Sequence, residues 1–305
     1  MNKVDIKVLI IGFGSMGRKH YEVLKKITNN ITILTKQKKI NHKRITLVKD
    51  ILKLDPDYIV ISCETIKHYS FIKFIEKNLK NKIILIEKPI MEKFRNLKIK
   101  NNKYFIGYNL RFHPVILFLK KIIKQKDVNF INLNCSSYLP HWRKNIEYSK
   151  SNSALKKKGG GVILELSHEL DYIKWLFGSI NPIFKFNKKI SNLKINTDDI
   201  LIIFGKIKKN ININICMNFF SRYNNREIII DGKNFSINAN ILKKRVDIFF
   251  KNRKKKTIKW ANFKIKQTYL DQHVAILKKK YNQLCSPAEA LATLKFIDKI
   301  KESTI

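Results

Sequence analysis

The chain has 305 residues, with 63 Lys or Arg against 23 Asp or Glu, and therefore a formal net charge of +40 at pH 7. Its length suits one large domain or two ordinary ones, and a hydrophobic fraction of 44% excludes an intrinsically disordered chain. No apolar run approaches the roughly 18–20 residues that span a membrane. Asp5 and Lys7 interrupt the N-terminal stretch that a secretory signal would keep apolar.

A net charge this high is the usual electrostatic sign of a nucleic-acid partner, but the residue types behind it favour another explanation. Only nine of the basic residues are arginine, whose forked side chain is the one that nucleic-acid readers favour. Lysine, asparagine and isoleucine share A/T-rich codons, so a base bias in the genome would raise the charge without any partner. We therefore expect a solvated cationic surface, with neither nucleic acid nor a membrane as partner.

The cysteines point to an intracellular protein without disulfides. They are scattered singly, which excludes a C-x-x-C metal site and does not form the framework of a secreted domain. They lie at residues 63, 135, 216 and 285. We expect a reducing, cytoplasmic location.

The first third of the chain alternates predicted strands and helices. Its strands are continuous apolar runs, which suit a parallel sheet covered on both faces. They are expected at residues 6–11, 31–34, 46–48, 58–62, 83–86 and 104–106. Helices are expected at residues 15–27 and 66–79, where apolar side chains recur at helical spacing. The pattern predicts a doubly wound, Rossmann-type α/β domain over residues 1–119.

The remainder groups its strands together, which predicts an α+β domain with a largely antiparallel open sheet over residues 120–305. The strands are expected at residues 128–139, 183–186, 200–207, 211–220, 227–230, 235–237, 246–250 and 258–263. One helix is expected at residues 162–177, and two more close the chain at residues 271–284 and 287–300. These C-terminal helices are candidates to pack back on the first domain. The basic run at residues 253–256 is expected to be a hairpin turn.

Six of the ten glycines fall in two clusters, and the first cluster forms a dinucleotide-binding motif. Gly12, Gly14 and Gly17 make a G-x-G-x-x-G pattern after a strand and at the start of a helix, the context that supports this motif. The first glycine allows a tight turn, the second lets the backbone approach a pyrophosphate, and the third lets helix and strand pack closely. We expect NAD(P) here, bound by Gly12, Phe13, Gly14, Ser15, Met16 and Gly17.

The end of the second strand carries no acid to read the ribose. An NAD site usually has an Asp or Glu about 20 residues after the glycines, but Thr35 and Lys36 occupy this position. No acid occurs from Val23 to Lys49. A hydroxyl followed by lysines tolerates or attracts a 2′-phosphate, so the sequence leans slightly towards NADP.

The tripeptide Glu87-Lys88-Pro89 follows the fifth strand of the first domain. Together with the glycine motif, Glu64-Thr65, and the stretches at residues 107–114 and 159–171, it resembles the Gfo/Idh/MocA family of oxidoreductases (glucose–fructose oxidoreductase / inositol dehydrogenase), over the whole chain. The resemblance implies a cis peptide before Pro89. It also adds cofactor-binding residues beyond the glycine loop, namely Cys63, Glu64, Thr65, His68, Glu87 and Lys88.

The catalytic groups are expected at Lys88 and His168. Oxidising a carbinol needs a hydride acceptor and a base within hydrogen-bond reach of the hydroxyl, and Lys88 lies at the end of a strand where doubly wound sheets bind their ligands. The resemblance implies that Lys88 and His168 are the proton-transfer pair. Asp171 shares a helix face with His168, and Glu165 lies a turn earlier. The family places its acid four residues before the histidine, whereas Glu165 precedes it by three. With no second histidine nearby, we expect no metal.

The loop from Tyr138 to Ala154 is expected to close over the substrate. It carries Trp142, which can stack on a sugar ring, and Arg143, which can bind a carboxylate or phosphate. Alternatively, Trp142 only anchors this loop to the core and Arg143 is a surface residue. Its sequence is similar to a branch of the family in bacterial surface-glycan pathways, which implies a sugar or nucleotide-sugar substrate. Substrate contacts are expected from Asn109, Arg111, Trp142, Arg143, Glu165 and Asp171.

The sequence therefore predicts a cytoplasmic NAD(P)-dependent oxidoreductase acting on a sugar CH–OH group, in polysaccharide or glycan sugar biosynthesis. The open face of the second sheet is expected to pair into a homodimer or homotetramer, as the resemblance implies. Three alternatives remain open: an imine or pyrrole reductase on the same fold, a non-catalytic NADP-binding regulator, and a basic nucleic-acid binder, which a continuous stripe of Lys and Arg on the surface would support.

Overall fold

The computed structural model describes residues 3–124, 127–143, 147–208 and 211–302. The chain divides into two compact units, one made of Met1–Asn109 with Lys264–Lys295 and the other of Leu110–Phe263 with Phe296–Ile305. The division after Asn109 comes earlier than the expected boundary at Leu119. Within the described ranges, no helix is long and apolar enough to cross a membrane.

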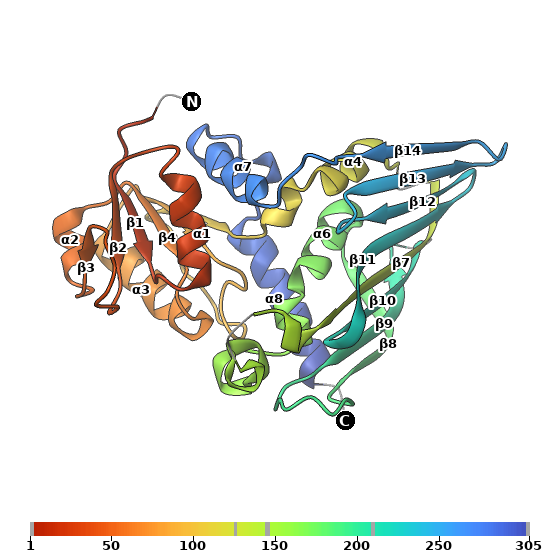
Figure 1. Cartoon of the computed structure of the whole chain (residues 1–305), viewed down its shortest axis with the longest axis horizontal. Helices are drawn as coiled ribbons and strands as arrows, with labels where there is room; N and C mark the ends of the chain where they lie inside the picture. The colour runs from red at the N-terminus through yellow and green to blue at the C-terminus, as the bar shows by residue number, and fades with distance from the viewer. Residues whose placement is uncertain (1–2, 125–126, 144–146, 209–210, 303–305) are drawn as a thin grey trace. The chain divides into compact units, whose positions relative to one another are not determined.

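The first unit contains a six-stranded parallel sheet in the order β3-β2-β1-β4-β5-β6 (Figure 1). The strands are β1 (Val8–Ile11), β2 (Ile31–Leu34), β3 (Arg44–Ile45), β4 (Tyr58–Ile61), β5 (Ile83–Ile86) and β6 (Lys103–Ile106). Every residue of β1, β2 and β4 is buried, as expected for a parallel sheet covered on both faces. The strand order reverses between β1 and β4, which is where doubly wound sheets bind their ligands.

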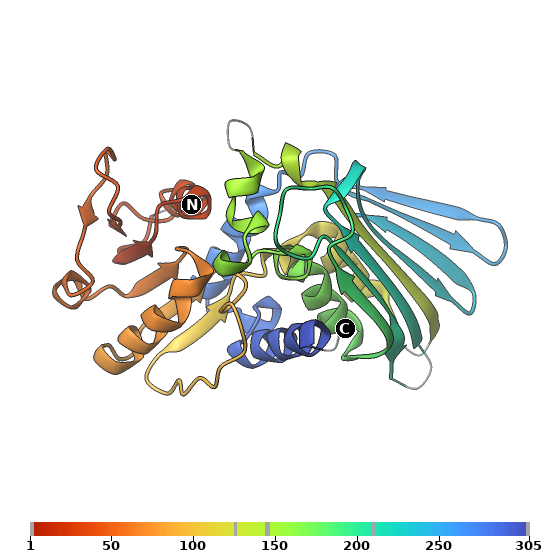
Figure 2. The ribbon, with the colours of Figure 1, turned by 90° about the horizontal axis from the view of Figure 1, so that it is seen from below.

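Helices cover both faces of this sheet. Because α1 and α3 connect neighbouring strands in opposite directions along the sheet, right-handed crossovers place them on opposite faces (Figure 2). A helix from the C-terminal part of the chain, α7, packs against α1. The helices of this unit are α1 (Ser15–Leu24), α2 (Asp50–Leu54), η1 (Thr65–Lys67), α3 (His68–Asn78), α7 (Lys266–Leu277) and η8 (Tyr281–Gln283), and the last helix, α8 (Pro287–Glu302), contains the division between the units.

The second unit contains an eight-stranded sheet in the order β14-β13-β12-β11-β7-β10-β9-β8. Its neighbours pair antiparallel, except that β7 and β10 are parallel. The strands are β7 (Val128–Tyr138), β8 (Ile180–Lys188), β9 (Ile200–Ile207), β10 (Ile211–Asn218), β11 (Phe220–Gly232), β12 (Phe235–Asn240), β13 (Arg245–Phe250) and β14 (Lys255–Lys259). The two sheets confirm the predicted fold class, a Rossmann domain followed by an α+β domain.

The two faces of this second sheet differ in character. In β10 the isoleucines and Met217 alternate with half-buried polar residues, and on the polar face the Asn214 side chain donates to Asn132 Oδ1 at 2.9 Å. Helices cover the apolar face, and none of the described helices covers the polar one (Figure 1). The helical segments of this unit are η2 (Asn109–Phe112), α4 (Pro114–Ile122), η4 (Leu139–His141), η5 (Tyr148–Lys150), η6 (Asn152–Ala154), η7 (Lys156–Lys158), α5 (Val162–Glu165) and α6 (Ser167–Phe177).

Several elements differ from their sequence-based bounds, among them α7, which is Lys266–Leu277 and not residues 271–284, and β14, which is Lys255–Lys259 and not residues 258–263. The helix expected at residues 162–177 is two helices, α5 and α6, separated at Leu166, where φ is −94° and ψ is 24°. Apolar periodicity misses this break because both helices bury residues along the same stretch. Strand β11 begins well before residue 227, since its first half is polar and pairs with β7 without an apolar signal. Strand β3 lies at Arg44–Ile45 rather than at residues 46–48.

Candidate active site

The glycine motif forms the turn between β1 and α1. Gly12 has a φ of +89°, and a Cβ there would lie 2.6 Å from Cys63 Cα, so only glycine fits. A Cβ at Gly17 would lie 2.1 Å from Gly12 O, which explains how closely α1 packs on the turn. Gly14 is different, because a Cβ there meets no described atom within 4 Å. The packing of the described residues does not require glycine at this position, and the open space leaves room for a group to approach the backbone.

The start of α1 is suited to bind an anion. Gly14 is its N-cap, and no side chain of the described residues caps it. Gly14 and Ser15 are exposed and Met16 is half-buried, whereas Phe13 is 3% exposed and supports the turn from inside. The first N–H groups of a helix have no partner within the helix, and the helix dipole favours negative charge at this end. The residues present therefore fit a pyrophosphate.

The end of β2 carries two predicted ribose contacts with different surroundings. Thr35 is 9% exposed, and its hydroxyl oxygen accepts a hydrogen bond from the backbone N–H of Gln37 at 3.2 Å. Lys36 is exposed. The side chain of Thr35 therefore shapes the turn after β2, while that of Lys36 is available to a ligand.

Two arginines that the sequence analysis did not select lie beside this turn. Arg18 donates to Gln37 Oε1 at 3.1 Å and its guanidinium lies over the Phe13 ring, 4.5 Å from the ring centroid. Gln37 Nε2 donates to the Phe13 carbonyl at 3.2 Å, and Arg44 donates to the Gln37 carbonyl. The glycine loop and the end of β2 are thus linked through Gln37, and both arginines donate to it.

His68 connects the loops that follow β4 and β5. It is 1% exposed, and its ring nitrogens lie 3.1 Å from the Cys63 carbonyl and 3.1 Å from the Pro89 carbonyl. Burial lowers the pKa of His68 and raises the pKa of the Cys63 thiol to about 12. His68 was expected to contact the cofactor. In the structure its ring lies between the loops of Cys63 and Pro89, and its contact with the cofactor remains a prediction.

The Glu87-Lys88-Pro89 segment follows β5. The Lys88–Pro89 peptide is cis, which confirms the expectation from the sequence. Lys88 is half-buried. Glu87 is 6% exposed, and its Oε1 lies 2.7 Å from His20 Nε2 in α1. A Cβ at Gly107 would lie 3.0 Å from the same oxygen, so a larger residue there would press on the Glu87 side chain.

The remaining predicted contacts of the first unit lie at the starts of short helices. Glu64 is exposed and its carboxylate lies 2.7 Å from Lys67 Nζ, while Thr65 begins η1. Asn109 is 3% exposed, and its side chain donates to Thr268 Oγ1 at 2.6 Å. Asn109 therefore anchors α7 to the end of the Rossmann sheet, a role that the sequence did not predict.

In the second unit, the triple glycine allows a carboxylate to cap α5. A Cβ at Gly160 would lie 2.5 Å from backbone carbonyls of η6, and at Gly161, where φ is +114°, it would lie 2.3 Å from Asp198 Oδ1. The Asp198 backbone carbonyl and Oδ2 accept the first two N–H groups of α5, each at 3.0 Å. This contact fixes the entry to the helical segment that carries the predicted catalytic histidine.

His168 lies in the first turn of α6 and is half-buried. Asp171 follows it by one turn and is 2% exposed. Glu165, also half-buried, is the last residue of α5, on the other side of the break at Leu166. The structure therefore keeps the spacing between His168 and Asp171 on one helix and places Glu165 on another.

Two residues that the sequence predicts to bind substrate, Arg111 and Asp171, bind each other. Arg111 Nε lies 2.9 Å from Asp171 Oδ2 and Arg111 Nη2 lies 2.7 Å from Asp171 Oδ1. Both side chains are 2% exposed. The contact is a buried bidentate ion pair, and it joins η2 to α6. Contact of either residue with a substrate remains a prediction.

The loop after β7 is anchored by its tryptophan. Trp142 is half-buried, donates from Nε1 to Ser137 Oγ at 3.0 Å, and packs edge-on against Phe219 with ring centroids 5.1 Å apart. Arg143 is exposed, and positions 144–146 of this loop lie outside the described residues. A small pocket under the loop is lined by Leu139, Trp142, Arg143, Tyr148, Ser151 and Ser153.

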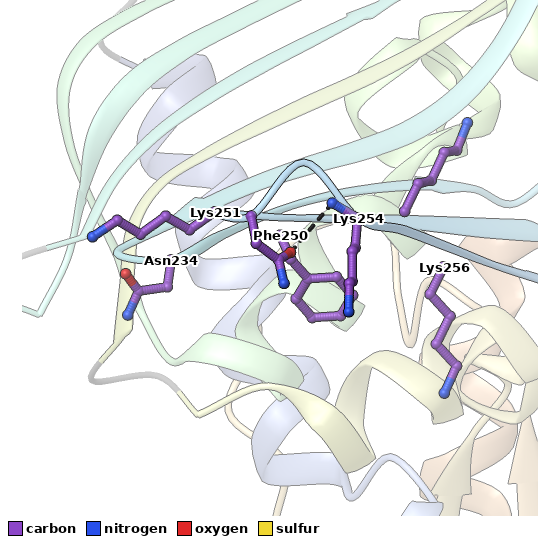
Figure 3. Close-up of a pocket in the computed structure, with 7 residues that line it drawn as sticks. Asn234, Phe250, Lys251, Lys254 and Lys256 are labelled. Atoms are coloured by element: carbon purple, nitrogen blue, oxygen red, sulfur yellow. Dashed lines mark hydrogen bonds between the residues drawn. The ribbon is translucent and has the colours of Figure 1, made fainter.

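A second, open hollow lies at the far end of the β13–β14 hairpin. The basic run at residues 253–256 forms the turn of this hairpin and the start of β14, as predicted, and Lys254 N donates to Asn252 Oδ1 at 3.2 Å. The hollow is lined by Asn234, Phe250, Lys251, Asn252, Lys254, Lys255 and Lys256 (Figure 3). Its lysine chains spread apart from one another, and no carboxylate lies among the residues that line it.

Sequence reasoning missed residues that act through distant partners. Arg18, Gln37 and Arg44 carried no motif, although Arg18 lies within the first turn after the glycines. Asp198 caps α5, directly after the triple glycine, but it lies far from these glycines in the sequence, so no local pattern connected them. The buried histidines His20 and His273 were detectable only as polar residues on apolar helix faces. The described residues contain no group of three His, Cys, Asp or Glu side chains that could hold a metal ion.

Comparisons with known proteins connect this fold to sugar dehydrogenases. No protein-family model and no curated protein matches the sequence. Among solved structures, UDP-N-acetylglucosamine 3-dehydrogenase GnnA from Acidithiobacillus ferrooxidans has a TM-score of 0.76 at 14% identity, covering 98% of this chain and 97% of that one. Levoglucosan dehydrogenase in complex with NADH and levoglucosan has a TM-score of 0.80 at 14% identity, with 98% and 97% covered.

A third solved structure is the WlbA dehydrogenase from Bordetella pertussis, in complex with NADH and UDP-GlcNAcA. It has a TM-score of 0.76 at 14% identity, covering 100% of this chain and 96% of that one. At these identities the likeness concerns the fold and not the individual side chains. The chain has the fold of the Gfo/Idh/MocA dehydrogenases.

Proposed function

We propose that this protein is an NAD(P)-dependent oxidoreductase of the Gfo/Idh/MocA family that acts on a CH–OH group of a sugar or nucleotide sugar. The observation that carries the proposal is Gly14, whose missing side chain serves no packing need of the fold and leaves room beside the uncapped start of α1. The likeness to dehydrogenases whose structures hold NADH supports it. When bound, the nicotinamide supplies the hydride acceptor or donor.

Residues of the chain bind the cofactor, move the proton and contact the substrate. The glycine turn and the first N–H groups of α1 hold the pyrophosphate. Lys88, at the end of β5, and His168, in the first turn of α6, hold and move the proton of the reacting hydroxyl. Lysine can do this because its three N–H donors rotate, and histidine because its ordinary pKa lies near neutrality. Trp142 and Arg143 supply a ring face and a cation to the substrate.

The cofactor proposed is NADP rather than NAD. Arg18, Lys36 and Arg44 lie around the end of β2, where Thr35 and Lys36 stand in place of the usual acid, and guanidinium groups bind phosphate oxygens well. The Michaelis constants for both cofactors test this directly. Equal or lower constants for NAD would refute the preference.

The substrate proposed is a sugar or nucleotide sugar of a surface polysaccharide or glycan, and the location proposed is the cytoplasm. The similar structures named after UDP-N-acetylglucosamine and in complex with UDP-GlcNAcA support a nucleotide sugar, while levoglucosan dehydrogenase supports a free one. Turnover measured across UDP-linked and free sugars distinguishes the two classes. The asparagine-lined open face of the second sheet is the proposed homodimer or homotetramer surface, and light scattering of the purified protein tests it.

Replacing the proposed proton-transfer residues one at a time tests the reaction. Lys88→Ala and His168→Ala are each expected to lower turnover at least about a hundredfold, with cofactor affinity within about threefold of the unchanged protein. Lys93→Ala, which removes an exposed lysine of the same segment, is the matched control and should turn over normally. A near-normal rate in either variant would remove that residue from the mechanism. Cofactor binding without turnover of any sugar would favour a regulator.

A further inference from the structure

The tip of the β13–β14 hairpin, residues 250–256, carries the densest run of positive charge in the chain. Five of the six residues from Lys251 to Lys256 are lysine or arginine, compared with 63 of 305 in the whole sequence. No Asp or Glu occurs from Ile248 to Leu270. The charge at this tip is therefore well above the average that the composition of the chain sets.

Backbone hydrogen bonds give the tip a defined conformation. Phe250 N donates to the Lys254 carbonyl at 2.9 Å, and Arg253 N donates to the Phe250 carbonyl at 3.0 Å. Arg253 completes the turn with a φ of +60°. Lys251 N donates to the Asn234 carbonyl at 3.1 Å, which ties the tip to the neighbouring turn between β11 and β12. The lysine side chains therefore project from an ordered backbone.

The apolar side of β13 continues into this tip. Alternate residues of a strand lie on the same face, and on this face Val246 is 0% exposed and Ile248 is 8% exposed, whereas Phe250 is 43% exposed. Figure 3 shows the Phe250 ring in the open hollow at the tip, with lysine side chains on either side of it. The hollow thus combines an exposed aromatic ring with several cations.

The charges around this ring are not neutralised from within the protein. Asp247 is the carboxylate of β13, and its oxygens lie 2.6 Å from Arg245 Nε and 3.6 Å from Lys255 Nζ. Among the residues that the structure describes, no ion pair involves Lys251, Lys254 or Lys256. These lysines are therefore available to an anionic partner.

The shape of the cluster favours a broad anionic surface over a single small anion. The lysine side chains spread apart from one another instead of converging on one point (Figure 3). A lipid surface attracts them through its overall negative potential, for which a point charge such as lysine suffices, whereas readers of nucleic-acid phosphates use the arginine fork. A single-stranded nucleic acid also stacks successive bases on several rings, and the hollow offers one ring, that of Phe250.

We propose that the tip of the β13–β14 hairpin docks on the surface of an anionic lipid bilayer. Its lysines lie among the head groups, and the Phe250 ring enters the boundary between head groups and acyl chains. This docking goes beyond the proposed function and does not rest on it. It differs from the expectation, drawn from the composition, that the cationic surface has no membrane partner.

The docking leaves the proposed oligomer surface free. The register of the sheet places Phe250 opposite Phe235, on the face that carries Ile237 and Ile248. The asparagines proposed for pairing, such as Asn214, lie on the other face. A dimer formed through that face therefore still exposes the Phe250 ring.

Co-sedimentation of the full chain with sucrose-loaded vesicles measures the docking. Vesicles of equal parts phosphatidylglycerol and phosphatidylcholine should bind the protein at least about tenfold more tightly than pure phosphatidylcholine, at about 0.15 M salt. Equal binding to both kinds of vesicle, or binding to neither, would overturn the proposal. Because the whole chain is cationic, variants have to show which part of the surface is responsible.

The first variant removes three tip lysines, Lys251→Gln, Lys254→Gln and Lys256→Gln, together. Each lysine near an anionic surface contributes a factor of about five, so binding to the phosphatidylglycerol vesicles should weaken about a hundredfold. The matched control removes three exposed lysines of β8, β9 and the residue after β8, at the opposite edge of the same sheet, namely Lys188→Gln, Lys189→Gln and Lys206→Gln. The control should bind within about threefold of the unchanged protein. Equal losses in both variants would show that the overall charge binds the vesicle, and would overturn the proposal.

Phe250→Ser tests the apolar part of the contact. Transfer of a half-exposed phenyl ring into the lipid boundary should strengthen binding about five- to tenfold, so this variant should lose that factor. Phe94→Ser is the control, since Phe94 is 39% exposed and lies in the first unit; it should change nothing. An unchanged affinity of Phe250→Ser would overturn insertion of the ring.

The same variants measured with oligodeoxythymidylate separate a lipid surface from a nucleic acid. Phe250→Ser should leave DNA binding within about twofold, because the proposal assigns the ring to lipid. A loss of DNA binding as large as the loss of vesicle binding would identify the hollow as a stacking site for bases, and would overturn the lipid assignment. Cofactor affinity should be unchanged in every variant, so a protein that binds no NAD(P) would overturn the proposed function alone.

Discussion

Replacing Gly14 with alanine should separate cofactor binding from stability more cleanly than any other change in the glycine loop. The added Cβ meets no described atom of the protein within 4 Å, and the backbone of Gly14, with φ of −76° and ψ of −161°, is open to any residue. The methyl group therefore occupies only the space that the proposal assigns to the pyrophosphate. The variant should therefore fold as the unchanged protein does but bind the cofactor more weakly.

The two expected magnitudes follow from the same geometry. Alanine restricts the unfolded chain, which stabilises a protein by about 0.4–1 kcal/mol, but it is a poorer N-cap than glycine by a similar amount. The free energy of unfolding should therefore change by less than about 0.5 kcal/mol. Displacing the pyrophosphate from one charge-assisted hydrogen bond to α1 costs about 1.5–3 kcal/mol, which weakens the cofactor Kd about 10- to 150-fold.

Isothermal titration with NADPH and NADH, alongside thermal unfolding, measures both quantities on one sample. Gly12→Ala is the contrasting variant, because its Cβ would lie 2.6 Å from Cys63 Cα at a φ of +89°. It should lose stability and binding together. A Gly14→Ala protein that binds the cofactor within twofold of the unchanged protein would refute the assignment of this loop to the pyrophosphate.

Three further outcomes follow from contacts in the structure. Arg18→Ala should raise the Kd for NADPH about tenfold and leave the Kd for NADH within twofold. Lys80→Ala, an equal charge loss at an exposed site, should change neither Kd. An equal effect of Arg18→Ala on both cofactors would contradict a 2′-phosphate contact. Asp171→Asn should lower the free energy of unfolding by about 3–5 kcal/mol because it leaves Arg111 buried without its counter-charge. Adding Arg111→Met to this variant should restore much of the lost free energy. Unchanged thermal unfolding of Asp171→Asn with a raised KM would show instead that Asp171 binds the substrate. Burial, with Arg226 and Lys244 nearby, lowers the pKa of His113 to about 4. The unfolded chain therefore binds the extra proton between pH 6.5 and 4, so stability falls as pH falls through this window by up to about 3 kcal/mol. His113→Asn keeps an acceptor for the Val115 N–H and should flatten that dependence in melting temperature against pH, and an unchanged slope would contradict it.

The Rossmann sheet could be predicted from the sequence because its signals are local. Strands such as β1 and β4 are buried on both faces and so appear as unbroken apolar runs. The glycine motif lies within a single turn, and each of its conformational requirements belongs to one residue. The bounds of β11 could not be found in this way, since its first half pairs with β7 through polar residues whose alternation carries no apolar pattern.

The candidate site was predictable in its residues but not in their partners. Asp171 and Arg111 were both selected from motifs, and nothing in either motif indicated that the two would pair at 2.7 Å. His68 was selected as a cofactor contact, and nothing in the motif indicated that its ring nitrogens would each lie 3.1 Å from a backbone carbonyl, that of Pro89 and that of Cys63. Contacts of this kind join residues that the fold alone brings together, so a single sequence can propose the residue types and cannot assign their hydrogen bonds.

Only nine of the 63 basic residues are arginine, and their positions in the structure bear on the origin of the net charge. If the surface were selected to bind a polyanion, arginines would be expected on exposed faces where their forked groups reach phosphates. Arg111 and Arg226 instead hold the buried carboxylates of Asp171 and Glu169 in α6. Both positions use the planar geometry of the guanidinium, which lysine cannot supply. The exposed arginines, among them Arg143, Arg222 and Arg253, show no such requirement, so the two buried ion pairs are the places where a base bias towards lysine would be resisted.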